Sequence, residues 1–221
     1  MSEIIYRLQQ FPNLIRIVPE KKILIGNSYY HMGLKGTLPD MYIREGVWQQ
    51  LLNAKDLLPN HLAFYLFDTY RSLETQKDLF LYMKNIIRTQ DPSLDEVALM
   101  AKTRTFVADP FNLEIRHKLS HPTGAAVDLT LYDLETKQIV DMGTPFDDPT
   151  ELSSTHYFSS HTSSPEKEFH QYRALLYQTM SQVGFTNYSK EWWHYDLGDY
   201  SWSHKNGHSW HYDIIEKISE T

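Results

Sequence analysis

Two short segments hold the side chains that could bind a metal ion and use it. The segment SHPTGAAVDLTLYD contains His121 and Asp128, and the segment EWWHYD contains Glu191 and His194. The chain has no cysteine, so a metal must bind through nitrogen and oxygen atoms. Two histidines and one carboxylate give three such ligands and leave a fourth position for water, which is the arrangement expected of catalytic rather than structural zinc.

Each of these residues also has an ordinary structural interpretation. The chain has 11 histidines, and most histidines are polar groups satisfied by solvent or by hydrogen bonds. Asp128 could face solvent, because alternate residues of a strand point to opposite sides of a sheet. Glu191 and His194 are three residues apart, so a turn, a bulge or a strand end is needed to bring them to one site.

The residues around these positions favour convergence. Gly124 would allow a tight turn after His121, and residues 125–133 alternate apolar and polar side chains as a strand does. A carboxylate inside such a strand is unfavourable unless it is paired, solvated or bound to a metal, and Asp128 is in that position. The two tryptophans of EWWHYD predict a surrounding poor in water, where a metal and a carboxylate interact strongly.

Helix and strand signals alternate along the rest of the chain without a repeat period. Ser93 and Glu96 form a capping box that predicts one helix start, and Ser164 with Pro165 predicts another as N-cap and first helical residue. Helices are expected at residues 43–58, 73–88, from 93 onward and 164–184, and strands at 62–70, 125–133 and in one or two pieces of 185–202. This mixed order is typical of an α+β fold rather than a doubly wound parallel sheet.

Composition limits the classes of protein that need to be considered. A length of 221 residues with 41% hydrophobic content suits one domain, residues 1–221. A net charge of -7 and the lack of a lysine or arginine run argue against a nucleic-acid partner. Neither an export signal nor an apolar run long enough to span a bilayer is found, so we expect a cytoplasmic protein with no membrane association.

In combination, these motifs resemble those of the D-alanyl-D-alanine dipeptidases, the zinc-dependent family that includes the vancomycin-resistance dipeptidase. The resemblance extends from Leu62 to Trp202, with an additional stretch near residues 151–164. This chain departs from the family pattern at three positions. It has Leu119 where the family usually has serine, Thr69 where the family has glycine, and Ser72 where the family has proline. The matched patterns are H-x-x-G-x-A-x-D at His121, Gly124, Ala126 and Asp128, E-x-x-H at Glu191 and His194, M-G-T-x-F-D within Asp141 to Asp147, and Y-R at Tyr70 and Arg71.

This resemblance implies a Hedgehog-like fold, in which helices flank an antiparallel-rich central sheet, and one zinc ion per chain. The reaction it implies is hydrolysis of the small substrate D-Ala-D-Ala to free amino acids. Glu191 would be the general base, Arg71 would stabilise the oxyanion, and Asp147 would pair with the substrate ammonium. Arg71 could instead form a surface salt bridge, and Asp147 could instead cap a turn.

Two other functions stay open at this point. A related zinc peptidase could act on peptidoglycan stem peptides as a D,D-carboxypeptidase or cell-wall endopeptidase, and an open groove would favour it. A zinc-containing binding module could keep the metal without catalysis, but the presence of Glu191 and an open fourth ligand position argue against it. The segment HKNGHSWHYD near the carboxyl end has no assigned role, and the oligomeric state is not predicted.

Overall fold

The computed structural model describes residues 13–209 and 211–216. The strands are β1 (Leu14–Arg16), β2 (Ile23–Ile25), β3 (Tyr42–Arg44), β4 (Leu62–Asp68), β5 (Ala126–Asp133), β6 (Gln138–Ile139), β7 (Thr186–Asn187) and β8 (His194–Asp196). The α-helices are α2 (Ser28–His31), α3 (Glu45–Leu57), α4 (Leu73–Gln90), α5 (Glu96–Thr103), α6 (Glu166–Gln182) and α7 (Tyr200–Asn206). Short 3₁₀ helices are η1 (Leu113–Lys118), η2 (His121–Thr123), η3 (Glu151–Ser153) and η4 (Tyr157–Ser160).

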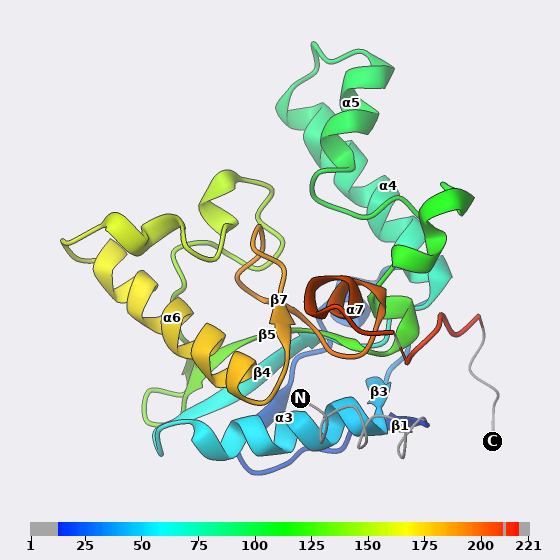
Figure 1. The fold of residues 1–221 in the computed structure, drawn as a ribbon. Coiled ribbons are helices and arrows are strands. Elements are labelled where there is room, and N and C mark those ends of the chain that lie inside the picture. The colour runs from blue at the N-terminus through cyan, green and yellow to red at the C-terminus, as the bar shows by residue number, and fades with distance from the viewer. Residues whose placement is uncertain (1–12, 210, 217–221) are drawn as a thin grey trace.

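A mixed sheet forms the centre of the molecule (Figure 1). Its strand order is β2-β4-β5-β8-β7, and β6 pairs with β5. Only the β2–β4 pairing of this sheet is parallel among the described residues, and the other pairings are antiparallel. The prediction of an α+β fold with an antiparallel-rich sheet flanked by helices is therefore confirmed.

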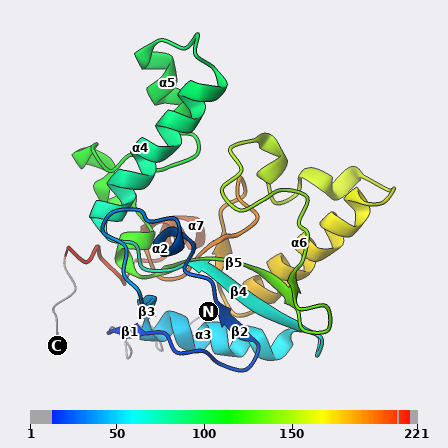
Figure 2. The same ribbon diagram turned by 180° about the vertical axis from the view of Figure 1, so that it is seen from behind.

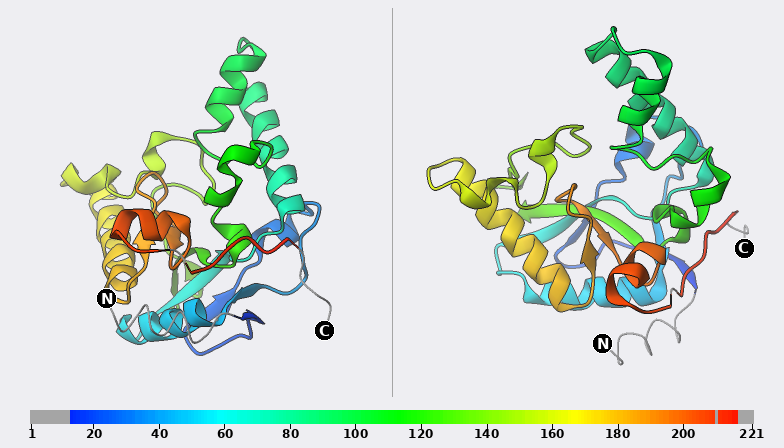
Figure 3. Two further views of the ribbon diagram at one scale, coloured as in Figure 1. Left: turned by 45° about the vertical axis from the view of Figure 1, so that its right-hand side comes forward. Right: turned by 45° about the horizontal axis from the view of Figure 1, so that its top comes forward.

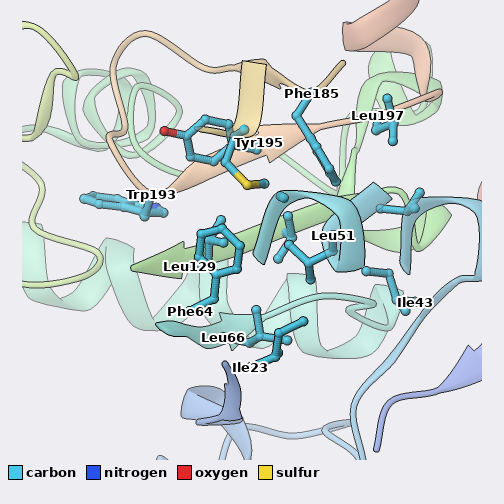
Figure 4. Close-up of a cluster of buried hydrophobic side chains, with 14 of the residues drawn as sticks. Ile23, Ile43, Leu51, Phe64, Leu66, Leu129, Phe185, Trp193, Tyr195 and Leu197 are labelled. Atoms are coloured by element: carbon cyan, nitrogen blue, oxygen red, sulfur yellow. The ribbon is translucent and has the colours of Figure 1, made fainter. Parts of the chain in front are cut away.

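Helices α3 and α6 cover one face of this sheet and form the main core with it (Figures 1 and 2). Figure 4 shows Leu51 of α3 close to Phe64 of β4 and Leu129 of β5, and all three side chains are fully buried. Strands β4 and β5 contribute alternate residues to this core, because successive side chains of a strand point to opposite faces. The residues between them point to the other face, where the candidate site lies.

Helices α4 and α5 pack against each other and project away from the sheet (Figure 3). They enclose a second cluster of buried side chains, which includes Leu79, Phe80 and Met83 of α4 and Leu99 of α5. The start of α4 lies next to the end of β4, so this projecting pair also borders the polar face of the sheet. No helix in the described part of the chain is both long and apolar enough to cross a membrane.

The predicted strands at 62–70 and 125–133 are confirmed as β4 and β5, and the helices differ mainly at their ends. Helix α3 begins at Glu45 rather than residue 43, because residues 42–44 pair with β1. The capping box at Ser93 was wrong: Asp95 caps α5 by accepting from the Ala98 amide.

The amino end of α6 also differs from the prediction. Pro165 is itself the N-cap, so the helix begins at Glu166, and the Ser164 hydroxyl donates to the Glu168 carboxylate instead of capping. In the aromatic segment 185–202, where one or two strands were predicted, the structure has β7 and β8, and helix α7, which begins within the segment at Tyr200, was not predicted.

Candidate metal centre and active site

Asp128 and His194 face each other across two neighbouring antiparallel strands. The register of β5 and β8 pairs Asp128 with His194, and residues directly opposite in such a pair point to the same face. The Asp128 Oδ1 and His194 Nδ1 atoms are 2.9 Å apart. Asp128 is only 2% exposed, so the alternative in which it faces solvent is excluded.

His121 reaches the same point from the turn before β5. Gly124, which ends η2, has φ 73, a left-handed conformation that favours glycine because other residues adopt it only with strain. The turn brings His121 Nε2 to 3.2 Å from both His194 Nδ1 and Asp128 Oδ2. Histidine at the turn and aspartate on the strand converge, as the sequence predicted.

The three side chains offer a donor set that fits a divalent metal ion. One ligand atom from each of His121, Asp128 and His194 lies within 4.8 Å of the other two, and all three residues are buried. Two imidazole nitrogens and a carboxylate oxygen are ligands of catalytic zinc, which keeps a further position for water or substrate. The predicted ligands are therefore brought together, and their cluster opens into a cavity.

Electrostatics within this cluster favour a cation. Burial by itself would raise the pKa of Asp128, but the charges and hydrogen bonds of His121 and His194 outweigh burial and lower it. Burial would likewise lower the pKa of His194, but Asp196 and Asp128 raise it well above its usual value. Asp128 is thus held as an anion between two ring nitrogens, which is a negatively charged position suited to a divalent cation.

Arg71 lies beside Asp128 because β4 ends in a bulge. The pairing register of β4 with β5 shifts just before Asp68, which brings Asp68 opposite Asp128. The buried Arg71 guanidinium then donates to Asp68 Oδ2 at 2.8 Å, to Gln76 Oε1 at 2.9 Å and to Asp128 Oδ2 at 3.3 Å. The alternative of a surface salt bridge for Arg71 is therefore wrong.

Asp147 faces this group from the loop before η3. Its Oδ2 atom accepts from the Tyr29 hydroxyl at 2.6 Å, and the same hydroxyl is 3.4 Å from Arg71 Nη2. Stacking of Phe146 on Phe67, with ring centroids 4.4 Å apart, holds the loop against the sheet. Burial raises the pKa of Asp147 to about 6, although the Tyr29 hydrogen bond opposes this.

Glu191 lies in the turn that joins β7 to β8. The Glu191 amide donates to the Tyr188 carbonyl oxygen at 2.9 Å, and His194, three residues later, is the first residue of β8. Because of this turn, Glu191 and His194 reach the same site although they are three residues apart. Loss of solvent around the Glu191 carboxyl, in the wall of the cavity, raises its pKa to about 8. A pKa near neutrality suits a general base.

One cavity of about 520 Å³ is lined by every predicted site residue: Arg71, His121, Asp128, Asp147, Glu191 and His194. Helix α4, residues 104–108 and helix α7 supply further parts of its wall. A second cavity of about 380 Å³ shares Asp147, Glu191 and Trp193 with the first and continues along residues 148–157. The site is therefore accessible, and room extends beyond Asp147.

Sequence reasoning missed several polar residues that contact the predicted ones, among them Tyr29, Asp68, Gln76 and Asp196. Tyr29 lies outside the segment of resemblance, and no pattern marked it. Asp196 could have been found, because it follows His194 by two residues and so shares its face of the strand. The Asp196 Oδ1 and His194 Nε2 atoms are 2.8 Å apart.

The sequence of this chain is similar to those of known proteins. The sequence model of a family described as Peptidase_M15, D-ala-D-ala dipeptidase, matches residues 43–217. The D-alanyl-D-alanine dipeptidase of Enterococcus faecium is 39% identical over 157 residues, which are 68% of this chain and 70% of that protein. Proteins of the same description from Synechocystis sp. and Escherichia coli are 37% and 41% identical, over 42% and 35% of this chain and 41% and 37% of their own length.

Two solved structures also align with this chain. A mutant of the vancomycin resistance D,D-pentapeptidase VanY in complex with Zn(II) aligns with a TM-score of 0.45 and 16% identity, over 80% of this chain and 85% of that chain. VanYB in complex with D-alanine-D-alanine aligns with the same TM-score and identity, over 76% of this chain and 80% of that chain.

Proposed function

Because the chain belongs to the D-Ala-D-Ala dipeptidase family, Peptidase_M15, we propose that it is a zinc-dependent dipeptidase that hydrolyses D-Ala-D-Ala to free alanine. One observation carries the proposal: His121, Asp128 and His194 offer ligand atoms within 4.8 Å of one another, and Glu191 lines the same cavity. This combination provides a metal site together with a carboxylate that is not one of its ligands.

The zinc ligands under this proposal are His121 Nε2, His194 Nδ1 and a carboxylate oxygen of Asp128, the atoms that face one another in the cluster. Zinc bound there supplies Lewis acidity, which polarises a peptide carbonyl and lowers the pKa of a water molecule to about 7.

Glu191 takes the role of general base and then general acid. Its carboxylate accepts the proton of the water that attacks the peptide carbonyl, and later returns this proton to the leaving amine. The raised pKa of Glu191, about 8, supports this double role, because the group can both hold and release a proton near neutral pH. The buried Trp193 lines the cavity beside Glu191 and gives it an apolar wall there.

Arg71 stabilises the negative charge that develops on the carbonyl oxygen. Burial by itself would lower the pKa of Arg71, but Tyr29, Asp68 and Asp128 outweigh burial and raise it, so the guanidinium stays charged. Its contacts with Asp68 and Gln76 fix it before substrate binds. A donor held in place in this way stabilises a transition state without reorganising.

Asp147 and Tyr29 receive the substrate ammonium. A carboxylate at this edge of the cavity can form a charge-assisted hydrogen bond with the free amino group of a dipeptide. An internal peptide unit has no such group, so Asp147 favours free dipeptides over long chains. Since the substrate under this proposal is a free dipeptide rather than a wall polymer, we also expect the protein to act in the cytoplasm.

A D,D-carboxypeptidase acting on stem peptides is a second candidate, and the second cavity supports it. That cavity of about 380 Å³ begins at Asp147 and Glu191 and continues along residues 148–157, where residues on the amino side of the scissile bond could lie. Both candidates use the same metal site and the same base. We further propose that residues 1–221 form one peptidase domain, since the two clusters of buried side chains both contact Phe146.

The test is a metal and hydrolysis assay on the purified protein. We expect about one zinc per chain and release of alanine from D-Ala-D-Ala, with activity lost to a chelator and restored by zinc. The panel includes L-Ala-L-Ala and a diacetylated L-Lys-D-Ala-D-Ala, which lacks a free amino group near the scissile bond. Cleavage of only the acylated tripeptide would favour the carboxypeptidase, and hydrolysis insensitive to chelation would refute the zinc mechanism.

A further inference from the structure

Both ring nitrogens of His194 have a carboxylate partner, and only one of these partners is a predicted metal ligand. Nδ1 faces Asp128 Oδ1 at 2.9 Å, while Nε2 faces Asp196 Oδ1 at 2.8 Å. Asp196 is 2% exposed, so its carboxylate has little water to bind. A buried carboxylate in this place has a specific partner in the imidazole ring.

The position of Asp196 is fixed by the sheet. Strand β8 lies between β5 and β7, and Asp196 pairs with Ala126 on one side and Thr186 on the other. His194 and Asp196 are alternate residues of this strand and therefore share the face that carries the site. The opposing Ala126 has a small side chain, which leaves room for the Asp196 carboxylate to reach the ring.

We propose that Asp196 is a positioning residue that fixes the tautomer and orientation of His194, so that the lone pair of Nδ1 points to the metal. A carboxylate only accepts hydrogen bonds, so the hydrogen of the neutral ring is held on Nε2. Ring nitrogens opposite the metal are commonly bound to a carboxylate or carbonyl oxygen in this way, and loss of that partner weakens metal affinity. The inference rests on the proposed zinc site.

The other histidine of the cluster, His121, has different hydrogen-bond partners from His194. A substitution of Asp196 therefore affects the orientation of His194 alone. His121 Nδ1 lies 2.7 Å from the Thr69 carbonyl oxygen and 3.2 Å from Asp68 Oδ2. The Thr69 carbonyl oxygen belongs to the backbone, so side-chain substitution does not remove it. On His194 Nε2, the other polar neighbour is the Ser120 hydroxyl at 3.4 Å, a longer contact that does not select one tautomer, since a hydroxyl both donates and accepts.

The test compares Asp196→Asn with Asp199→Asn in the full chain. An asparagine at 196 can turn its amide NH₂ toward Nε2 and so permit the tautomer with hydrogen on Nδ1, which blocks the metal. Asp199 is a matched control: it is buried, it caps α7 by accepting from the Trp202 amide, and asparagine caps equally well. Burial and the charge of Asp196 raise the pKa of Asp199 well above its usual range.

Zinc affinity is measured by competition with a chromophoric chelator, and activity at saturating zinc is recorded separately. We expect Asp196→Asn to raise the zinc dissociation constant by about 10- to 100-fold, and Asp199→Asn to change it less than about twofold. A merely structural role would lower the thermal stability of both the zinc-free and zinc-loaded protein without this selective loss. Equal zinc affinity of Asp196→Asn and wild type would overturn the inference while leaving the proposed function intact.

A measurement on the wild-type protein keeps the inference testable if Asp196→Asn does not fold. In the zinc-loaded protein, nitrogen-15 NMR of the imidazoles should show hydrogen on His194 Nε2 and none on Nδ1. Hydrogen on Nδ1 would overturn the assignment. If the wild-type protein binds no zinc, the proposed function and this inference are both refuted. The zinc titration of the wild type identifies that outcome without any variant.

Discussion

Replacement of Asp147 by asparagine should separate recognition of the substrate ammonium from metal binding. Asparagine has nearly the same shape as aspartate. It keeps an oxygen that can accept from the Tyr29 hydroxyl, which in the wild type lies 2.6 Å from Asp147 Oδ2. The backbone at Asp147 has φ 62, in the left-handed region that asparagine tolerates better than most residues. The substitution therefore removes the charge and disturbs little else.

The expected loss follows from the type of contact. A hydrogen bond to a charged group contributes about 1.5–3 kcal/mol, and each 1.4 kcal/mol corresponds to about a tenfold change. We therefore expect kcat/KM for D-Ala-D-Ala to fall by about 10- to 150-fold. The effect should lie mainly in KM, because the ammonium is bound in the ground state and the transition state alike.

The assay pairs D-Ala-D-Ala with its N-acetyl derivative, which lacks the ammonium, and measures zinc content alongside. The variant should keep its zinc and lose activity only on the free dipeptide. In the wild type, Asp147 has a pKa of about 6, and only its deprotonated form attracts the ammonium. KM should therefore rise as the pH falls through about 6, and this limb should be absent from the variant. An equal loss on both substrates, or no loss on either, would refute the reasoning.

The remaining predictions concern the base, the metal site and the core. Glu191→Gln should lower kcat by about 10²- to 10⁴-fold while metal analysis still finds zinc; loss of zinc would show that Glu191 is a ligand. Asp128→Ala should remove zinc, because His121 and His194 lose the carboxylate that they share, so metal content equal to wild type would contradict the site. Leu129→Ala, in the fully buried core, should lower the free energy of unfolding by about 2–5 kcal/mol in urea titrations; a change below about 1 kcal/mol would contradict its place in the packing.

The elements that carry the metal ligands could be predicted from sequence because their local signals agree with the fold. Strand β5 alternates apolar and polar residues, and the positive φ at Gly124 favours glycine before it. The start of α5 shows the opposite case. Ser93 and Glu96 have the spacing of a capping box, but Asp95 lies nearer to the helix and takes the amide of Ala98. Spacing alone does not decide between competing caps.

The contacts between distant segments could not be predicted in the same way. Tyr29 reaches Asp147 across a separation of 118 residues, and nothing in the sequence around either residue specifies that pairing. Asp68 turns toward Asp128 because the register of β4 shifts by one residue, and strand periodicity assumes a constant register. Tyr29 and Asp68 thus depend on a tertiary contact and on a bulge rather than on local spacing, whereas Asp196 follows from the two-residue period of strand β8.

The origin of each side chain explains why the site and the core can be changed independently. Asp128, His194 and Asp196 stand on paired strands, and the alternate residues Val127 and Tyr195 are fully buried on the opposite face of the same strands. The ligand geometry therefore depends on the same backbone pairing that orders the core, while the chemistry lies on side chains that the core does not use. Substitutions on the site face should alter metal affinity or turnover with small effects on unfolding, and substitutions on the core face should do the reverse until the pairing of β5 with β8 itself is lost.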